Sequence, residues 1–277
     1  MNTHTAYTPA TTEYLDRSDG RIAYDVAGSG PLLVLIPGMG DLRATYRLTV
    51  SPLVAAGYRV ATTDLRGHGD SDTTFASYGD AETAGDVLAL IEQLGGPAVI
   101  VGNSMGAAAA ACAAAERPDL VEGLVLVGPF VRNGQVNSFM RAMMRIAMAP
   151  AWVAASWKAY APRLYAGRRP ADLDAHIDSV ITSLRRPGYG KAFSLTTRVD
   201  HAPAQERLAG ITAPTLVVMG ELDPDFPDPR AEAEWIATTL NGTVTMIPEA
   251  GHYPQSQQPD VVNEAVLDFL SQTVKRG

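Results

Sequence analysis

Cysteine is almost absent from the 277-residue chain, which contains only Cys112. A single cysteine cannot form an intrachain disulfide, and it excludes both a zinc site built from several cysteines and a CxxC redox pair. Because Cys112 lies in an alanine-rich stretch, we expect its thiol to be buried and unreactive. Disulfide-based folding and cysteine-based metal or redox chemistry are therefore excluded.

Basic residues and long apolar runs are also scarce. The chain has 22 Lys and Arg against 30 Asp and Glu, a net charge of −8, and it lacks the basic blocks that bind phosphate backbones. The most apolar long stretch, residues 140–157, is interrupted by Arg141, Arg145 and Pro150, so it falls short of a membrane span. The first twelve residues do not resemble a signal peptide. We therefore predict a cytoplasmic protein with neither nucleic acid nor membrane as a partner.

What the sequence does contain is typical of an α/β protein. Apolar residues make up 46% of the chain and charged residues 19%, as in soluble globular proteins. Short apolar runs alternate with helical patterns, which predicts parallel strands buried between helices in a doubly wound sheet. The Asp19-Gly20 pair favours a tight turn, which predicts that residues 12–15 and 22–25 form an antiparallel hairpin ahead of the parallel strands. The predicted parallel strands are residues 32–36, 59–62, 98–101, 123–127, 215–219 and 244–247.

One segment breaks this alternation. More than eighty residues with helical patterns and no convincing strand separate the strand that ends near Val127 from the one that begins at Thr215. An ordinary connection in such a sheet needs one helix and short loops. We therefore predict a core of residues 1–130 and 211–277, with residues 131–210 inserted as a helical lid.

A nucleophile is indicated by the sequence GNSMG at residues 102–106, between the strand 98–101 and an alanine-rich helix. This is the G-x-S-x-G nucleophile elbow in the setting that it requires. The turn is so sharp that side chains at the two glycine positions would collide. We expect Ser104 to project above the sheet, with the N–H of Met105 at the helix N-terminus donating to an oxyanion.

A serine needs a base, and the base needs an orienting acid, which in this fold follow in the order serine, acid, histidine. His252 lies directly after the strand 244–247 and is the predicted base. The loop after 215–219 carries three carboxylates, of which Asp223 is the preferred acid because the Gly-x-x-Asp spacing places it at the loop apex. Glu221 and Asp225 remain alternatives.

A second oxyanion donor is expected in the loop after the first parallel strand. That loop, residues 37–40, reads PGMG, and its glycines allow a backbone N–H to approach the substrate. The N–H of Met39 is the predicted donor, together with that of Met105.

These motifs, with the D-x-R-G-x-G-x-S sequence at residues 64–71, resemble the α/β-hydrolase superfamily, in the serine hydrolase branch that carries a helical lid. The resemblance implies an α/β-hydrolase fold, Ser104 as nucleophile, His252 as general base and acid, Asp223 as its orienting partner, and a lid that forms the acyl pocket. Pro37 stands where the family commonly has histidine, so the hydrogen bonds of that histidine are missing.

The leading functional hypothesis is a serine hydrolase that cleaves a small apolar carboxylic ester, lactone or thioester, without cofactor or metal. One alternative keeps the triad for carbon–carbon bond hydrolysis or for cofactor-free perhydrolase or haloperoxidase chemistry, and another is a ligand receptor without turnover. The only predicted partner is a small-molecule substrate, and the oligomeric state is left open. The predicted substrate-contacting residues are Gly38, Phe130, Met140, Met144, Trp157 and Tyr253.

Overall fold

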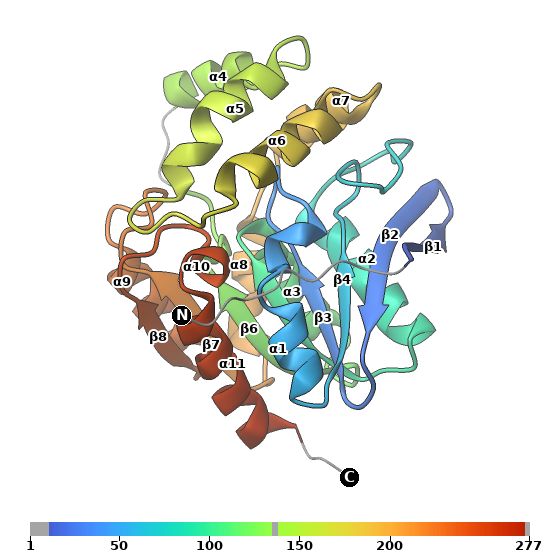
Figure 1. The fold of residues 1–277 in the computed structure, drawn as a ribbon, viewed down its shortest axis with the longest axis vertical. Coiled ribbons are helices and arrows are strands. Elements are labelled where there is room, and N and C mark those ends of the chain that lie inside the picture. Colours follow the sequence, from blue (N-terminus) through green and yellow to red (C-terminus); the bar gives the residue numbers. More distant parts are fainter. Residues whose placement is uncertain (1–10, 135–137, 275–277) are drawn as a thin grey trace.

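The computed structural model describes residues 11–134 and 138–274, and an eight-stranded sheet runs through their centre (Figure 1). The strand order is β1-β2-β4-β3-β5-β6-β7-β8. β1 and β2 form the predicted hairpin, β2 pairs antiparallel with β4, and the remaining neighbours are parallel. The strands are β1 (Glu13–Arg17), β2 (Gly20–Ala27), β3 (Leu32–Ile36), β4 (Arg59–Thr63), β5 (Ala98–Asn103), β6 (Val121–Val127), β7 (Thr215–Gly220) and β8 (Thr243–Ile247). The predicted mostly parallel sheet is confirmed.

The sheet has a hydrophobic core on each face because alternate residues of a strand point in opposite directions. In β3, Val34 and Ile36 pack in one core, whereas Leu33 and Leu35 pack in the other. This two-sided burial explains why β3, with the sequence LLVLI, is an uninterrupted apolar run.

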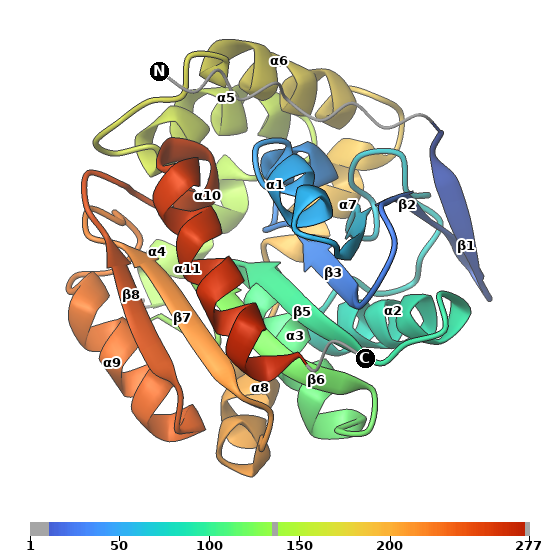
Figure 2. The same ribbon diagram turned by 60° about the horizontal axis from the view of Figure 1, so that its bottom comes forward.

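Helices cover both faces, as Figure 2 shows. The first core contains residues of α2, α3, α8 and α9, and the second contains residues of α1 and α11. Cys112 of α3 is buried in the first core, and burial raises the pKa of its thiol to about 11, as expected of an unreactive cysteine. The bounds are α1 (Val50–Ala55), α2 (Asp80–Gln93), α3 (Met105–Glu116), α8 (Ala202–Arg207), α9 (Pro229–Leu240) and α11 (Pro259–Thr273).

The helical insertion lies between β6 and β7, above the carboxyl ends of the parallel strands (Figure 1). It consists of α4 (Ser138–Ala147), α5 (Val153–Leu164), α6 (Leu173–Leu184) and α7 (Tyr189–Thr196), after which α8 returns to pack on α3. Helices α5, α6 and α7 share a third hydrophobic core that includes Trp157 and Phe193. The side chains described in α4 are exposed. Short helices complete the described elements: η1 (Arg43–Tyr46), η2 (Leu208–Gly210) and α10 (Pro254–Gln257).

Within 11–134 and 138–274, none of the helices combines the length and the apolar character that crossing a bilayer requires.

Candidate active site

Ser104 occupies the turn between β5 and α3 in a backbone conformation that side chains rarely adopt. Its φ is 56° and its ψ is −120°, which is strained for a residue other than glycine. A Cβ at Gly102 would lie 2.3 Å from the carbonyl oxygen of Gly106, and a Cβ at Gly106 would lie 2.6 Å from the last carbonyl of β3. The Ser104 N–H donates to the Val127 carbonyl at 2.9 Å. Close packing and this hydrogen bond therefore hold the elbow in the form that the sequence predicts.

His252 and Asp223 form a buried pair at the carboxyl ends of β8 and β7. His252 Nδ1 lies 2.7 Å from Asp223 Oδ2, and the two side chains are 3% and 0% exposed. Because the carboxylate can only accept, Nδ1 carries the proton that it donates to Asp223, and in the neutral ring the lone pair of Nε2 stays free. Asp225 is farther away, at 3.8 Å, and the exposed Glu221 faces Arg230 instead. Of the three carboxylates, Asp223 is therefore the one placed to orient the imidazole.

The elbow and the histidine loop are joined by residues on either side of Ser104. Asn103 Nδ2 donates to the carbonyls of Val127 and His252, at 3.0 and 3.2 Å. Phe130 donates its N–H to the Ser104 carbonyl at 3.2 Å, while its ring meets the ring of His252 edge-on at 5.8 Å. Asn103 and Phe130 therefore link the segment that carries Ser104 to the loop that carries His252, although 148 positions separate these two residues.

The electrostatics of the cluster favour a strong base. Burial lowers the pKa of His252, but the negative charge of Asp223 and the hydrogen bond to it outweigh burial and raise the pKa to about 9. The same interactions with Asp223 stabilise the imidazolium that forms when His252 takes a proton from a hydroxyl group.

Two backbone N–H groups belong to segments that border Ser104, those of Met39 and Met105. A Cβ at Gly38 would lie only 2.8 Å from Ser104 Cβ, so the loop that contains Met39 passes directly beside the serine. In the described part of the chain, neither the N–H of Met39 nor that of Met105 donates a hydrogen bond. Met105 is the first residue of α3, where N–H groups have no partner inside the helix. Both groups are thus free to bind an oxyanion.

The oxyanion loop that follows Pro37 is held by hydrogen bonds from other parts of the chain. The Gly40 N–H donates to Nε2 of His68 at 3.0 Å, and the His68 Nδ1–H bonds the Arg66 carbonyl at 2.9 Å. Burial lowers the pKa of His68, which keeps the ring neutral and Nε2 an acceptor. On the other side, Trp157 Nε1–H donates to the Gly40 carbonyl at 2.8 Å. The oxyanion loop is therefore held from both sides.

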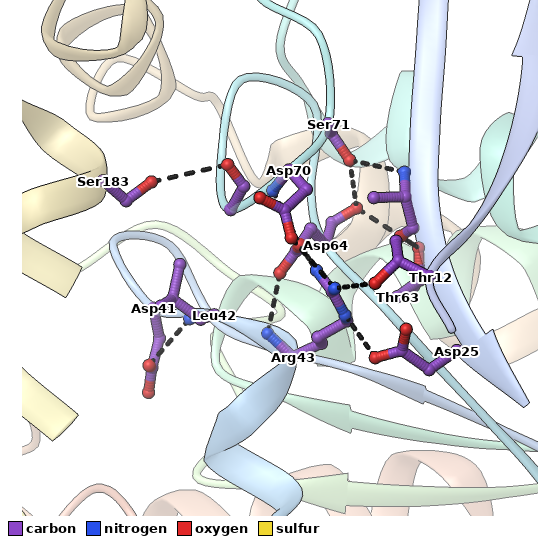
Figure 3. A network of polar contacts seen from close by, with 12 residues as sticks. Thr12, Asp25, Asp41, Leu42, Arg43, Thr63, Asp64, Asp70, Ser71 and Ser183 are labelled. Atoms are coloured by element: carbon purple, nitrogen blue, oxygen red, sulfur yellow. Dashed lines mark hydrogen bonds and ion pairs between the residues drawn. The ribbon is translucent and has the colours of Figure 1, made fainter. Parts of the chain in front are cut away.

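The chain beyond this loop is fixed by the charge network of Figure 3. Arg43 donates its backbone N–H to Asp64 at 2.8 Å, and its guanidinium contacts Asp25, Asp64, Asp70 and Thr12. This network ties the oxyanion loop to the 64–71 motif. A cavity of about 350 Å³ opens beside the network, but its lining includes none of the three triad residues, so it is separate from the candidate site.

The predicted substrate-contacting residues divide into several groups. Gly38 and Phe130 lie against Ser104 and His252 as described above. Trp157 is 4% exposed and contacts Gly40, and the buried Tyr253 stacks on Tyr165 at 4.7 Å. Met144 is 51% exposed on α4, and no described contact joins it to the triad. The side chain of Met140 lies outside the described residues.

Tyr160 was not predicted from the sequence. Its hydroxyl donates to Asp225 Oδ1 at 2.7 Å, from a lid helix 65 positions earlier in the chain. No local pattern marks this tyrosine, because the contact depends on how the lid packs on the core. Together with Trp157, it shows that the lid touches two of the loops that carry the candidate site.

Asp223, Asp225 and His252 also form a cluster whose possible metal-ligand atoms lie within 4.8 Å of one another. However, Asp223 Oδ2 binds the Nδ1 proton of His252 and Asp225 Oδ1 accepts from Tyr160. A histidine nitrogen that carries a proton cannot ligate a metal. The arrangement therefore suits proton transfer better than metal binding.

Comparison with known proteins points to one family of enzymes. Residues 33–265 match the model of the "Alpha/beta hydrolase family". BpoC of Mycobacterium tuberculosis, which carries the provisional name of a non-heme bromoperoxidase, is 30% identical over 90% of this chain and 97% of its own. The 2-hydroxy-6-oxononadienedioate/2-hydroxy-6-oxononatrienedioate hydrolase of Comamonas testosteroni is 30% identical over 92% of each chain. The structure of a thermophilic esterase from Thermogutta terrifontis covers 96% of this chain and all of its own, with a TM-score of 0.77 and 25% identity.

Proposed function

The chain belongs to the alpha/beta hydrolase family and is a hydrolase, and on that premise we propose that it cleaves a small apolar carboxylic ester through Ser104, His252 and Asp223. The observation that carries this proposal is the buried His252–Asp223 pair beside a serine held in a strained elbow. A serine hydroxyl becomes a nucleophile when such a base can remove its proton.

In the proposed mechanism, Ser104 Oγ attacks the ester carbonyl while His252 Nε2 accepts the hydroxyl proton. Asp223 holds the Nδ1 proton and stabilises the imidazolium. The N–H groups of Met39 and Met105 bind the oxyanion of the tetrahedral intermediate, whose collapse releases the alcohol with the proton from His252. Water then repeats the sequence on the acyl-enzyme and releases the carboxylic acid.

The preference for an apolar acyl group follows from the rings beside the base. Phe130 contacts the ring of His252 and also the ring of Phe226, at a centroid distance of 4.9 Å. Both phenylalanines are only partly buried, so a ligand can reach them. Aromatic surfaces bind apolar groups by removing them from water.

A second candidate reaction is hydrolysis of a carbon–carbon bond next to a ketone. It is favoured by the similarity to the Comamonas testosteroni hydrolase, whose name describes substrates with two carboxylates. Such a substrate needs a cationic side chain close to the base, whereas the rings described around His252 are those of Phe130 and Tyr253. The ester reaction therefore has more support from the site. Perhydrolysis, suggested by the similarity to BpoC, would begin from the same acyl-enzyme.

The test is labelling with a fluorophosphonate followed by peptide mass spectrometry. We expect a covalent adduct on Ser104 and none on the Ser104→Ala protein. A panel of p-nitrophenyl esters, lactones and vinylogous diketones, with added peroxide as a separate arm, then identifies the reaction. A parent protein that binds ligands but is neither labelled nor active would contradict the hydrolase mechanism and favour a receptor.

A further inference from the structure

The lid helix α5 contacts all three loops of the candidate site. Trp157 Nε1–H donates to the Gly40 carbonyl at 2.8 Å, and the Tyr160 hydroxyl donates to Asp225 Oδ1 at 2.7 Å. One turn later, the Leu164 carbonyl accepts the His252 N–H at 2.8 Å. The side chains of Trp157 and Tyr160 share one helix face at i, i+3 spacing, and the third contact comes from the backbone carbonyl of the last residue of α5. The oxyanion, acid and base loops are thus braced by one element.

From this arrangement we propose that α5 belongs to the catalytic apparatus, with Trp157 and Tyr160 as positioning residues for the oxyanion N–H and for a second carboxylate beside the base. The inference rests on the proposed function and assigns the lid a role beyond covering the substrate.

Trp157 acts on the oxyanion loop through the peptide groups that follow Met39. The Gly40 N–H is held by His68 and the Gly40 carbonyl by Trp157, and both side chains are buried. A Cβ at Gly40 would lie 2.5 Å from the Trp157 ring, so the loop and the indole are in close contact. These two hydrogen bonds fix the peptide planes on either side of Gly40, and the first of them adjoins the plane that carries the Met39 N–H. The Met39 N–H is proposed to bind the oxyanion, which forms only in the transition state. A displacement of this donor by about 1 Å can therefore cost roughly 10²-fold in rate while substrate binding changes little.

Tyr160 acts on the base through Asp225. The two oxygens of this carboxylate face in different directions: Oδ1 accepts from Tyr160, and Oδ2 lies 3.8 Å from His252 Nδ1. The Asp225 N–H donates to Asp223 Oδ1 at 3.1 Å, which joins the two acids. The Asp225 side chain is 18% exposed, so without the phenol it can turn toward water. Its negative charge is one of the causes that raise the pKa of His252.

The experiment deletes single hydrogen-bond donors in the full-length protein and keeps the rings. Trp157→Phe and Tyr160→Phe are compared with two matched controls. Trp152→Phe changes a half-exposed indole that precedes α5 and donates to Ile146. Tyr189→Phe removes a lid hydroxyl that donates to the core carbonyl of Ser71. The measurements are kcat, KM and pH dependence with p-nitrophenyl butyrate, the rate of fluorophosphonate labelling, and the thermal midpoint.

For Trp157→Phe we expect kcat and the labelling rate to fall about 10- to 100-fold, with KM within about twofold and no change in the pH profile. His68→Phe, which removes the other partner of Gly40, should give the same pattern and serves if Trp157→Phe does not fold. For Tyr160→Phe we expect the pH at which kcat/KM is half-maximal to fall by about one unit, as also in Asp225→Asn. Both controls should stay within about twofold of the parent.

The outcomes separate this inference from the proposed function. If the parent is labelled on Ser104 but Trp157→Phe matches Trp152→Phe in kcat, the role of Trp157 is refuted while the proposed function stands. If the pH profile of Tyr160→Phe stays in place or moves upward, the role of Tyr160 is refuted in the same way. If the parent is neither labelled nor active, the proposed function fails, and this inference fails with it.

Discussion

Replacing Asp223 by asparagine is the most direct test of the electrostatics of the candidate site. The substitution keeps the side-chain shape and removes the charge that lies 2.7 Å from His252 Nδ1. The new amide can donate its own N–H to Nδ1, which moves the ring proton to Nε2. Nε2 is the atom that must accept the proton of Ser104, so Asp223→Asn produces the wrong tautomer and leaves the imidazolium without its partner.

The size of the effect follows from the pKa of His252. The environment raises this pKa from 6.5 to about 9, and at about 1.36 kcal/mol per pKa unit this corresponds to about 3 kcal/mol of stabilisation of the imidazolium. Losing it lowers kcat roughly 10²-fold, and the wrong tautomer extends the loss toward roughly 10⁴-fold. Because burial of the ring remains, the pKa of the base should also fall, to below its ordinary value of 6.5.

The assay is hydrolysis of p-nitrophenyl butyrate between about pH 5 and about pH 10, which reports the pKa of the free base in kcat/KM. We expect the parent to gain activity up to about pH 9 and Asp223→Asn to lose that dependence together with most of its kcat. Glu221→Gln is the matched control, because it removes an exposed carboxylate from the same loop. A folded Asp223→Asn protein that keeps the parental kcat, or a half-maximal pH that stays near 9, would refute the reasoning.

Four further predictions concern the same site. Ser104→Ala should lower kcat by about 10⁴–10⁶ and abolish labelling, since no other triad member replaces the nucleophile; ligand binding measured by calorimetry should persist. Met39→Pro deletes one oxyanion donor and should lower kcat by roughly 10²–10³ in a protein whose circular dichroism is unchanged. Within a series of p-nitrophenyl esters, kcat/KM should rise up to about fourfold per CH₂ from acetate to butyrate, because each buried CH₂ contributes about 0.8 kcal/mol; a flat series would count against an apolar acyl pocket. Because the pKa of His252 is higher in the folded protein than its ordinary 6.5, its pairing stabilises the fold below about pH 6.5, and this is lost as the pH rises through about 9; the thermal midpoint should decline over that interval, less so in His252→Gln.

Much of the core could be predicted because its signals are local. The first parallel strand was expected at residues 32–36 and lies at Leu32–Ile36, and the others begin within two residues of the expected positions. The central strand β3 is a continuous apolar run because it is buried between the two hydrophobic cores. The elbow at Ser104 could also be predicted, because the steric need for its two glycines is contained in the five residues 102–106.

The parts that escaped prediction depend on contacts between distant segments. Gly40 forms hydrogen bonds with His68 and with Trp157, and Trp157 lies 117 positions away. No pattern near the PGMG sequence predicts either partner. The choice of Asp223 over Asp225 likewise required the distances to His252, because spacing along the loop ranks them only weakly. The sequence of α4 indicated an acyl-binding surface through residues such as Met144, whereas packing leaves that side chain half-exposed.

The contrast between the exposed α4 and the packed face of α5 also matters for protein engineering. Phe139, Met143 and Ile146 of α4 are at least half-exposed and take no part in the hydrogen bonds that hold the three loops. Randomising these positions should cost little stability, since substitutions on an exposed surface change it by about 0.5 kcal/mol or less. We therefore expect most variants in a library that randomises these α4 positions to fold. A library that randomises Trp157, Tyr160 and their neighbours should contain fewer folded variants.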